Sequence, residues 1–202
     1  MSEKLPTEHE VRSNVDAYAL APWGENLDYD ETRKYLEHIH EHEGGFVKTY
    51  RQNPNELPYL YVHGFNYKND IDALIGDEFS GSGAYYTAQD PSIIASALAE
   101  CGNVSYISSI HAAKDVQIPD EMKPRLQVFP ELIESIFAEN QSDSIVFYTH
   151  RDTAVFKAVS SLDANSFKVK IVSYEMGAKL SAKYNNNHTI DRLELVVIKR
   201  AS

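Results

Sequence analysis

The chain has 202 residues, of which 43% are hydrophobic and 24% charged, and its formal net charge is −11. This length and hydrophobic content are typical of one folded domain and exclude a wholly disordered chain. The acidic excess disfavours tight binding to duplex nucleic acid, whose phosphates are also negative. The sequence has no membrane-length apolar run, its start does not resemble a signal peptide, and its single cysteine excludes an internal disulfide. We therefore expect a cytoplasmic protein without membrane contact.

Residues 1–57 are predicted to form a polar extension that contains one helix. An apolar stripe runs through residues 27–39, and Gly44 follows at the point where the helix is expected to end. On this helix His38 and His42 share a face at a spacing that zinc ligands use. No third ligand is specified, so a solvated helix face is the favoured interpretation, and no metal is predicted.

Residues 58–202 are predicted to form a single domain in which strands and helices are intermixed. Asp90 and Pro91 are typical of the first turn of a helix, and Pro130 is expected to break another helix. Segment 153–162 fits either a helix or a strand. Strands are predicted at 59–65, 81–88, 104–112, 144–150, 167–174 and 192–199, and helices at 69–79, 90–102 and 122–140. This mixture indicates an α/β or α+β fold.

The most informative segment runs from the strand at 59–65 to the helix at 90–102. His63 and Gly64 end an apolar strand, and the absent side chain at Gly64 lets a ligand approach the backbone. The sequence Gly-Ser-Gly-Ala-Tyr-Tyr-Thr follows, with the tyrosines at Tyr85 and Tyr86. This arrangement resembles the NAD-binding core of ADP-ribosyltransferases of the diphtheria-toxin and poly(ADP-ribose) polymerase type.

The resemblance implies an α+β fold with split antiparallel sheets around an NAD cleft. It implies that His63 holds a ribose hydroxyl, that Gly64 grips the carboxamide through its backbone, and that Tyr85 or Tyr86 stacks on nicotinamide. The implied reaction transfers ADP-ribose from NAD, as substrate, to a protein or small-molecule acceptor and releases nicotinamide. On this interpretation the protein is a glycosyltransferase.

The same family uses a carboxylate near the start of a late strand. The segment 191–200 resembles that strand, and Glu194 stands at the position of the catalytic acid, which stabilises an oxocarbenium-like transition state. Glu175 and Asp152 are competitors for this role. Arg192 stands where enzymes that modify arginine carry a glutamine or glutamate, so an arginine acceptor is in doubt.

Two other interpretations stay open. Segment 142–185 resembles the C-terminal half of NYN/PIN-like ribonuclease domains, which have an α/β three-layer fold. Asp152 would then be a metal-binding carboxylate, but His63 replaces an expected aspartate and only Glu131 and Glu134 lie in the middle segment. Such a domain would be catalytically degenerate and would bind RNA or a protein partner. The third possibility is an inactive transferase-like fold that serves as an interaction domain.

Overall fold

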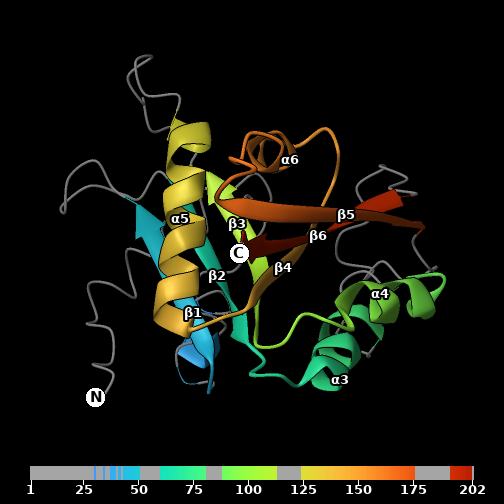
Figure 1. Ribbon diagram of the computed structural model, residues 1–202. Coiled ribbons are helices and arrows are strands. Elements are labelled where there is room, and N and C mark those ends of the chain that lie inside the picture. The colour runs from blue at the N-terminus through green and yellow to red at the C-terminus, as the bar shows by residue number, and fades with distance from the viewer. Residues whose placement is uncertain are drawn as a thin grey trace. The chain divides into compact units, whose positions relative to one another are not determined.

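The computed structural model describes residues 30, 34, 37–39, 41, 43–50, 60–80, 88–112, 124–175 and 192–201 (Figure 1). The chain divides into two compact units. Unit 1 comprises residues 1–65 and 107–128, and unit 2 comprises residues 66–106 and 129–202. The boundary expected between residues 57 and 58 stays a prediction.

Unit 1 contains an antiparallel pair of strands. Strand β1 (Gly45–Tyr50) pairs with β2 (Leu60–Asn66), so that Gly45 lies opposite Phe65 and Tyr50 lies opposite Leu60. Five successive residues of β2, from Leu60 to Gly64, are buried. A strand that is buried on both faces has a nearly continuous run of apolar residues in its sequence. For this reason β2 could be predicted from the sequence. The sequence did not predict β1.

Unit 2 contains a mixed sheet in which the strand order is β3-β4-β6-β5. Strands β3 and β4 are parallel over only three residue pairs, from Val104 opposite Ser144 to Tyr106 opposite Val146. Strand β6 lies between β4 and β5 and is antiparallel to both. The strands span Val104–Ala112 (β3), Ser144–Thr149 (β4), Phe167–Glu175 (β5) and Arg192–Arg200 (β6).

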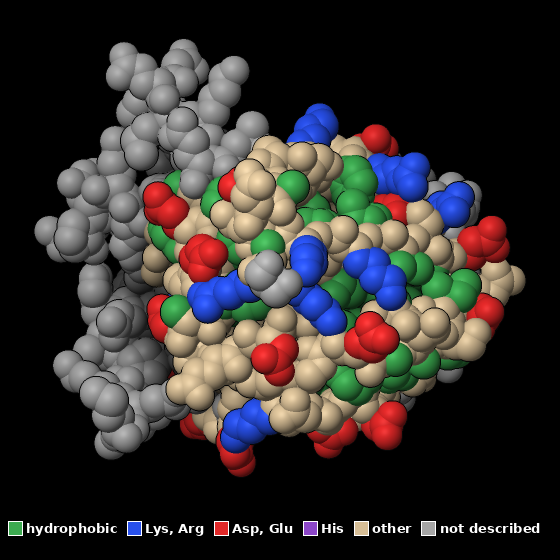
Figure 2. Space-filling view, in the orientation of Figure 1, with side chains coloured by type: hydrophobic (Ala, Val, Ile, Leu, Met, Phe, Trp, Pro, Cys, Tyr) green, Lys and Arg blue, Asp and Glu red, His purple; other side chains and the backbone are tan. Residues whose placement is uncertain are grey.

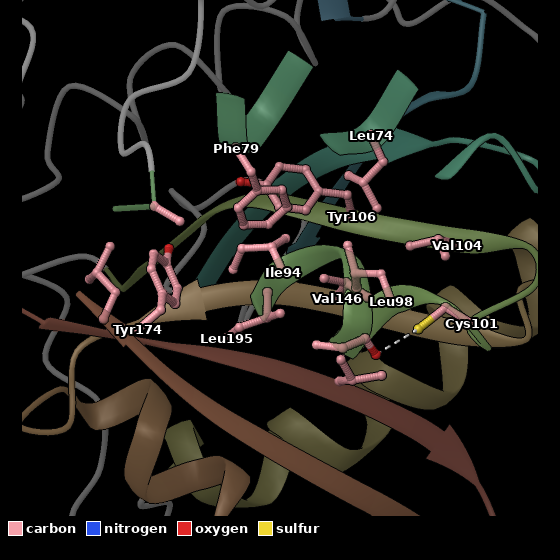
Figure 3. Packing of buried hydrophobic residues seen from close by; sticks show 14 residues of the cluster. Leu74, Phe79, Ile94, Leu98, Cys101, Val104, Tyr106, Val146, Tyr174 and Leu195 are labelled. Atoms are coloured by element: carbon pink, nitrogen blue, oxygen red, sulfur yellow. Dashed lines mark hydrogen bonds between the residues drawn. The ribbon is translucent and has the colours of Figure 1, made fainter. Parts of the chain in front are cut away.

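One face of this sheet is covered by the segment between β2 and β3. Helix α3 (Ile71–Leu74) runs directly into a π-helix, η2 (Ile75–Ser80), and α4 (Pro91–Leu98) follows. As predicted, Asp90 caps α4 by accepting a hydrogen bond from the amide of Ser92, and Pro91 occupies the first turn. Side chains of these helices and of all four strands form one buried cluster (Figure 3). Burial of this cluster is the main source of stability in unit 2.

The other face of the sheet is covered by α5 (Pro124–Asn140) and α6 (Ala154–Val159). Phe129 of α5 packs edge-on against Phe147 of β4, and Phe137 stacks on Phe167 of β5, with ring centroids 6.4 Å apart in each pair. The expected break at Pro130 is wrong, because α5 continues through this residue. Segment 153–162, whose sequence fits either a helix or a strand, contains helix α6.

Both fold classes expected from the sequence are wrong for unit 2. Split antiparallel sheets of the ADP-ribosyltransferase type do not contain the parallel pair β3 and β4. The three-layer PIN-like alternative requires a parallel sheet, yet β6 is antiparallel to both of its neighbours. Most individual elements were nevertheless predicted within a few residues, because apolar periodicity and helix caps are local signals.

Candidate functional site

The candidate site begins where β2 ends. The amide of Tyr67 donates to the carbonyl of Val104, and Lys68 and Asn69 adopt positive φ angles of 43° and 74°. Asp70 then caps α3 by accepting a hydrogen bond from the amide of Ala73 at 2.9 Å. This tight turn brings the chain back so that Tyr67 lies beside the following π-helix. Short π-helical turns occur frequently at functional sites.

Two carboxylates of η2 share a single phenol. The hydroxyl of Tyr67 lies 3.0 Å from Oε1 of Glu78 and 3.5 Å from Oδ2 of Asp77. Asp77 is exposed, whereas Glu78 is partly buried. Because one hydroxyl has one proton, Tyr67 cannot donate fully to both carboxylates. The two carboxylates therefore offer more acceptor atoms than the hydroxyl of Tyr67 can satisfy.

Aromatic rings from η2, β3 and β4 form the buried side of the site. Phe79 meets Tyr106 and Tyr148 edge-on, with ring centroids 5.8 Å and 6.3 Å apart. Tyr106 and Tyr148 lie 6.4 Å apart. Figure 3 shows Phe79 and Tyr106 next to each other in this cluster. Packing of rings at these distances is favourable and holds the neighbouring carboxylates in place.

The hydroxyl of Tyr106 is fully buried and has no hydrogen-bond partner within 3.5 Å, although it lies near enough to the carboxylate of Glu78 to lower the pKa of Glu78. Burial raises the pKa of Tyr106, and Tyr148, Glu78 and Tyr174 raise it further by their electrostatic interactions with the phenol. A buried hydroxyl without a partner costs about 1–3 kcal/mol. In native proteins such a group calls for a specific explanation, for example a bound water or a ligand.

The electrostatics of the site make Glu78 a group that titrates near neutrality. Burial raises the pKa of Glu78 from 4.5 to about 7; the hydroxyls of Tyr67 and Tyr106 oppose this shift, and the charge of Asp77 adds to it. The pKa of Tyr67 is raised above its usual value by burial and by the two carboxylates, so this phenol stays protonated. Glu78 can therefore accept a proton or hold a cation at physiological pH.

Glu194, the predicted catalytic acid, lies on the other face of the sheet. Leu193 and Leu195 belong to the cluster beside the candidate site, and alternation along β6 directs Glu194 away from it. Its side chain is 2% exposed, accepting hydrogen bonds from Nε of Arg151 and from Oγ of Ser173, each at 2.5 Å. Both carboxylate oxygens are thus engaged.

The two competitors of Glu194 are exposed acids. Asp152 has a side chain that is 90% exposed, and its Oδ2 lies 3.5 Å from Nδ1 of His150. Glu175 is exposed, and its carbonyl accepts from the amide of Gln89. Within the described ranges, no group of three His, Cys, Asp or Glu residues is close enough to hold a metal ion. The described residues therefore give no support to a zinc site at His38 and His42, and His42 lies outside these residues. They also give no support to a metal site formed by Asp152, Glu131 and Glu134.

The predicted NAD-binding residues fall into two groups. His63 lies in β2 of unit 1, is 1% exposed, and makes an edge contact with Tyr61 at a centroid distance of 5.5 Å. Gly64 is its buried neighbour, opposite Phe46 of β1. Tyr85 and Tyr86 lie outside the described residues, as does the rest of segment 81–87.

Glu78 and its neighbouring phenols were not predicted from the sequence. Segment 69–79 was predicted only as a short helix, and that element is present. One weak signal exists in the sequence, namely the adjacent acids Asp77 and Glu78 shortly before the apolar residue Phe79. Nothing local indicates that Tyr67 and Tyr106 meet them, because these contacts depend on the fold.

Comparison with known proteins gives one informative likeness. Neither a family nor a characterised protein matches the sequence. A solved structure of a mutant spermidine N-acetyltransferase from Vibrio cholerae matches with a TM-score of 0.52 and 11% identity, over 93% of this chain and 90% of that one. A ribosomal-protein-alanine N-acetyltransferase from Brucella melitensis matches with a TM-score of 0.48 and 14% identity, over 96% of each chain. The first likeness defines the fold of this chain as that of an N-acetyltransferase.

This finding overturns the functional interpretation drawn from the sequence. The resemblance to ADP-ribosyltransferases, the use of NAD, the release of nicotinamide and the glycosyltransferase class are wrong, because the structure whose fold this chain shares is that of an N-acetyltransferase. The PIN-like alternative is not supported either. Among the described residues, no helix combines the length and apolar character needed to cross a membrane.

Proposed function

We propose that this protein transfers an acetyl group from acetyl-CoA to the nitrogen of a primary amine. Two observations support the proposal: the likeness of the fold to an N-acetyltransferase and the Glu78 site in unit 2. The observation that carries it is the partly buried carboxylate of Glu78, which lies 3.0 Å from the hydroxyl of Tyr67 and whose pKa burial raises to about 7. A general base is most effective when its pKa lies near the working pH.

Glu78 would act as the base for the acceptor. An alkylammonium ion has no free electron pair, so it must lose a proton before its nitrogen attacks the thioester carbonyl. Glu78 accepts this proton while the hydroxyl of Tyr67 keeps the carboxylate oriented. The new N–C bond forms, the C–S bond breaks, and the sulfur leaves with the electron pair and takes up a proton. The products are the acetylated amine and free CoA, with one proton released to solvent.

Charge supports both substrates of the proposed reaction. Residues 44–150, which include Glu78, contain 14 acidic and 6 basic residues, a balance that attracts a cationic amine. Residues 151–202 contain 9 basic and 5 acidic residues, which suits an anionic donor such as acetyl-CoA. Figure 2 shows Lys and Arg side chains interspersed with Asp and Glu side chains on the face that it displays. A cytoplasmic location remains part of this proposal.

The test measures free CoA with a thiol reagent while acetyl-CoA is supplied with a panel of primary amines. We expect transfer to at least one amine, and Glu78→Gln should lower kcat/KM by about 10²–10⁴-fold, the usual contribution of a general base. Asp72→Asn is the matched control, because Asp72 is an exposed acid of the adjacent helix α3. Absence of transfer with every amine, or equal loss in both variants, would overturn the proposal.

A further inference from the structure

Strand β5 is the last strand of the sheet, so one of its long edges has no neighbouring strand among the described residues. On this edge the carbonyl of Glu175 accepts a hydrogen bond from the amide of Gln89, and the amide of Phe167 donates to the carbonyl of Asp163. Along an antiparallel strand the amide and carbonyl of one residue face the same side, and successive residues alternate. Every second residue between these two ends therefore presents its backbone groups outward. These residues are Val169, Ile171 and Ser173.

The side chains on one face of β5 are apolar and exposed in this open stretch. Phe167 stacks on Phe137 of α5, which places the odd-numbered side chains of β5 on that face of the sheet. Val169 and Ile171 are among them and are 36% and 40% exposed. Within the part of the chain that the structure describes, no other large hydrophobic side chain is exposed to this extent. The edge therefore combines outward backbone groups with uncovered apolar surface.

The side chains on the opposite face of β5 are basic. Nζ of Lys170 lies 3.4 Å from the carbonyl of Ala97, so Lys168 and Lys170 lie on the face that α4 covers. Lys199 of β6 pairs with Lys168 and donates to the carbonyl of Glu100. Apart from its last residue, β5 contains two lysines and no acid, in a chain of net charge −11. Three ammonium groups thus stand together beside this edge.

The charges favour an acidic partner over a second copy of this chain. Pairing of two β5 edges about a two-fold axis at Ile171 would satisfy the outward backbone groups. It would also bring the lysines of both copies together on one face, where like charges are destabilising. Lysine on an edge strand is a common protection against pairing of identical edges. An acidic strand is attracted by the same lysines.

We infer that the outer edge of β5 binds an extended acidic segment of a partner protein, which adds an antiparallel strand to the sheet. The backbone of this segment exchanges hydrogen bonds with Val169, Ile171 and Ser173. Its acidic side chains lie beside Lys168 and Lys170. Its apolar side chains, on the other face, cover Val169 and Ile171. The inference does not depend on the proposed acetyl transfer, because this edge contains none of the residues assigned to that reaction.

The test measures, by fluorescence anisotropy, binding of the full chain to a labelled peptide in which glutamate and valine alternate. We expect saturable binding that weakens at least tenfold from about 0.05 M to about 0.5 M NaCl, because salt screens exposed charges. A peptide with lysine in place of glutamate should not bind. The valines lie opposite the outward residues of β5, so methylation of the valine nitrogens should abolish binding. Methylation of the glutamate nitrogens, which face away from β5, should be tolerated.

Substitutions in β5 test the same contacts from the side of the protein. Ile171→Pro removes an outward amide and no hydrogen bond to β6, so it should lower the affinity about tenfold. Ile171→Glu keeps this amide but repels the peptide, and it should have a similar effect if the proline variant does not fold. Lys168→Glu should also weaken binding about tenfold. Lys157→Glu is the matched control and should bind as the parent does, because Lys157 is an exposed lysine of α6 and not of β5.

Several results would overturn the inference. They are absence of binding by the glutamate–valine peptide, equal binding by the lysine peptide, and equal effects of methylation at the valine and glutamate nitrogens. Equal losses in Lys168→Glu and Lys157→Glu would also count against it. A dimer in sedimentation that Ile171→Pro dissociates would assign the edge to a second copy instead. Because these experiments use no acetyl-CoA, failure of the peptide to bind leaves the proposed acetyl transfer standing.

Discussion

At the scale of single residues, Glu78 couples the stability of the protein to pH. Its pKa is about 7 in the folded protein and 4.5 as an ordinary carboxyl group. Between these values the folded state binds more protons than the unfolded state, so the free energy of unfolding falls as pH rises. Across this pH range, the titration of Glu78 lowers the free energy of unfolding by at most roughly 3 kcal/mol.

Replacement of Glu78 by glutamine removes this dependence. We expect the free energy of unfolding of the parent, measured with urea at pH 5 and pH 8, to fall more steeply with pH than that of Glu78→Gln. The variant should be the more stable of the two at pH 8, because it does not bury an ionised carboxylate. Parallel pH profiles for the two proteins would contradict the assigned pKa.

Glu194 has a different role at this scale from the one its position in the sequence suggests. Its buried carboxylate is neutralised by Arg151 and bonded to Ser173, and Nη2 of Arg151 also donates to Oγ of Ser173 at 3.1 Å. The three residues come from β6, β5 and the loop after β4. The arrangement ties these elements together at one end of the sheet.

At the scale of elements, this contact predicts a specific pattern of stability. Arg151→Met should destabilise unit 2 by about 2–3 kcal/mol, because it leaves Glu194 buried without a counter-charge. The expected loss is below that of a fully buried pair, since the Arg151 side chain is 64% exposed. The double variant Arg151→Met with Glu194→Leu should regain most of the loss in urea unfolding. Additive destabilisation in the double variant would show that the pair does not act as a unit.

A second prediction at this scale concerns the turn between α4 and β3. Gly102 has a φ of +66°, and a Cβ there would lie 2.5 Å from Oδ2 of Asp143. Asp143 cannot move away freely, because the same oxygen accepts a hydrogen bond from the amide of Asn103 at 2.9 Å. Gly102→Ala should therefore destabilise the protein by about 2 kcal/mol.

Gly76 provides the matched control for this prediction. A Cβ at Gly76 meets nothing within 4 Å, and alanine is the better helix former. Gly76→Ala should leave the thermal midpoint unchanged or raise it slightly. Equal destabilisation by both substitutions would mean that loss of a glycine, and not the geometry at Gly102, is responsible.

At the scale of the whole molecule, the connections between elements decide both fold and site. The site needs the turn at Tyr67, the π-helix with Glu78, and the strands that contribute Tyr106 and Tyr148. These residues are up to 81 positions apart in the sequence, and sheet pairing brings them together. Neither the mixed sheet nor the clustering of these side chains is encoded in a short motif.

The error in the functional interpretation has the same cause. The segments around His63 and Tyr85 resemble an NAD-binding core, but glycines and aromatic residues near strand ends also serve packing. In β2, His63 is a buried member of a strand and contacts Tyr61. A resemblance built on a few such residues does not specify which strands are neighbours.

The sequence by itself determined the local structure of this protein: most of the strands, the capped helix that begins after Asp90, and the buried character of β2 and β6. These features depend on neighbours within a few residues, which periodicity and capping reveal. Only the tertiary structure decided that β6 lies between β4 and β5, that Glu194 faces away from Glu78, and that Glu78 titrates near neutrality. Strand order, facing and desolvation arise from contacts between distant segments, and a pattern read along one chain does not contain them.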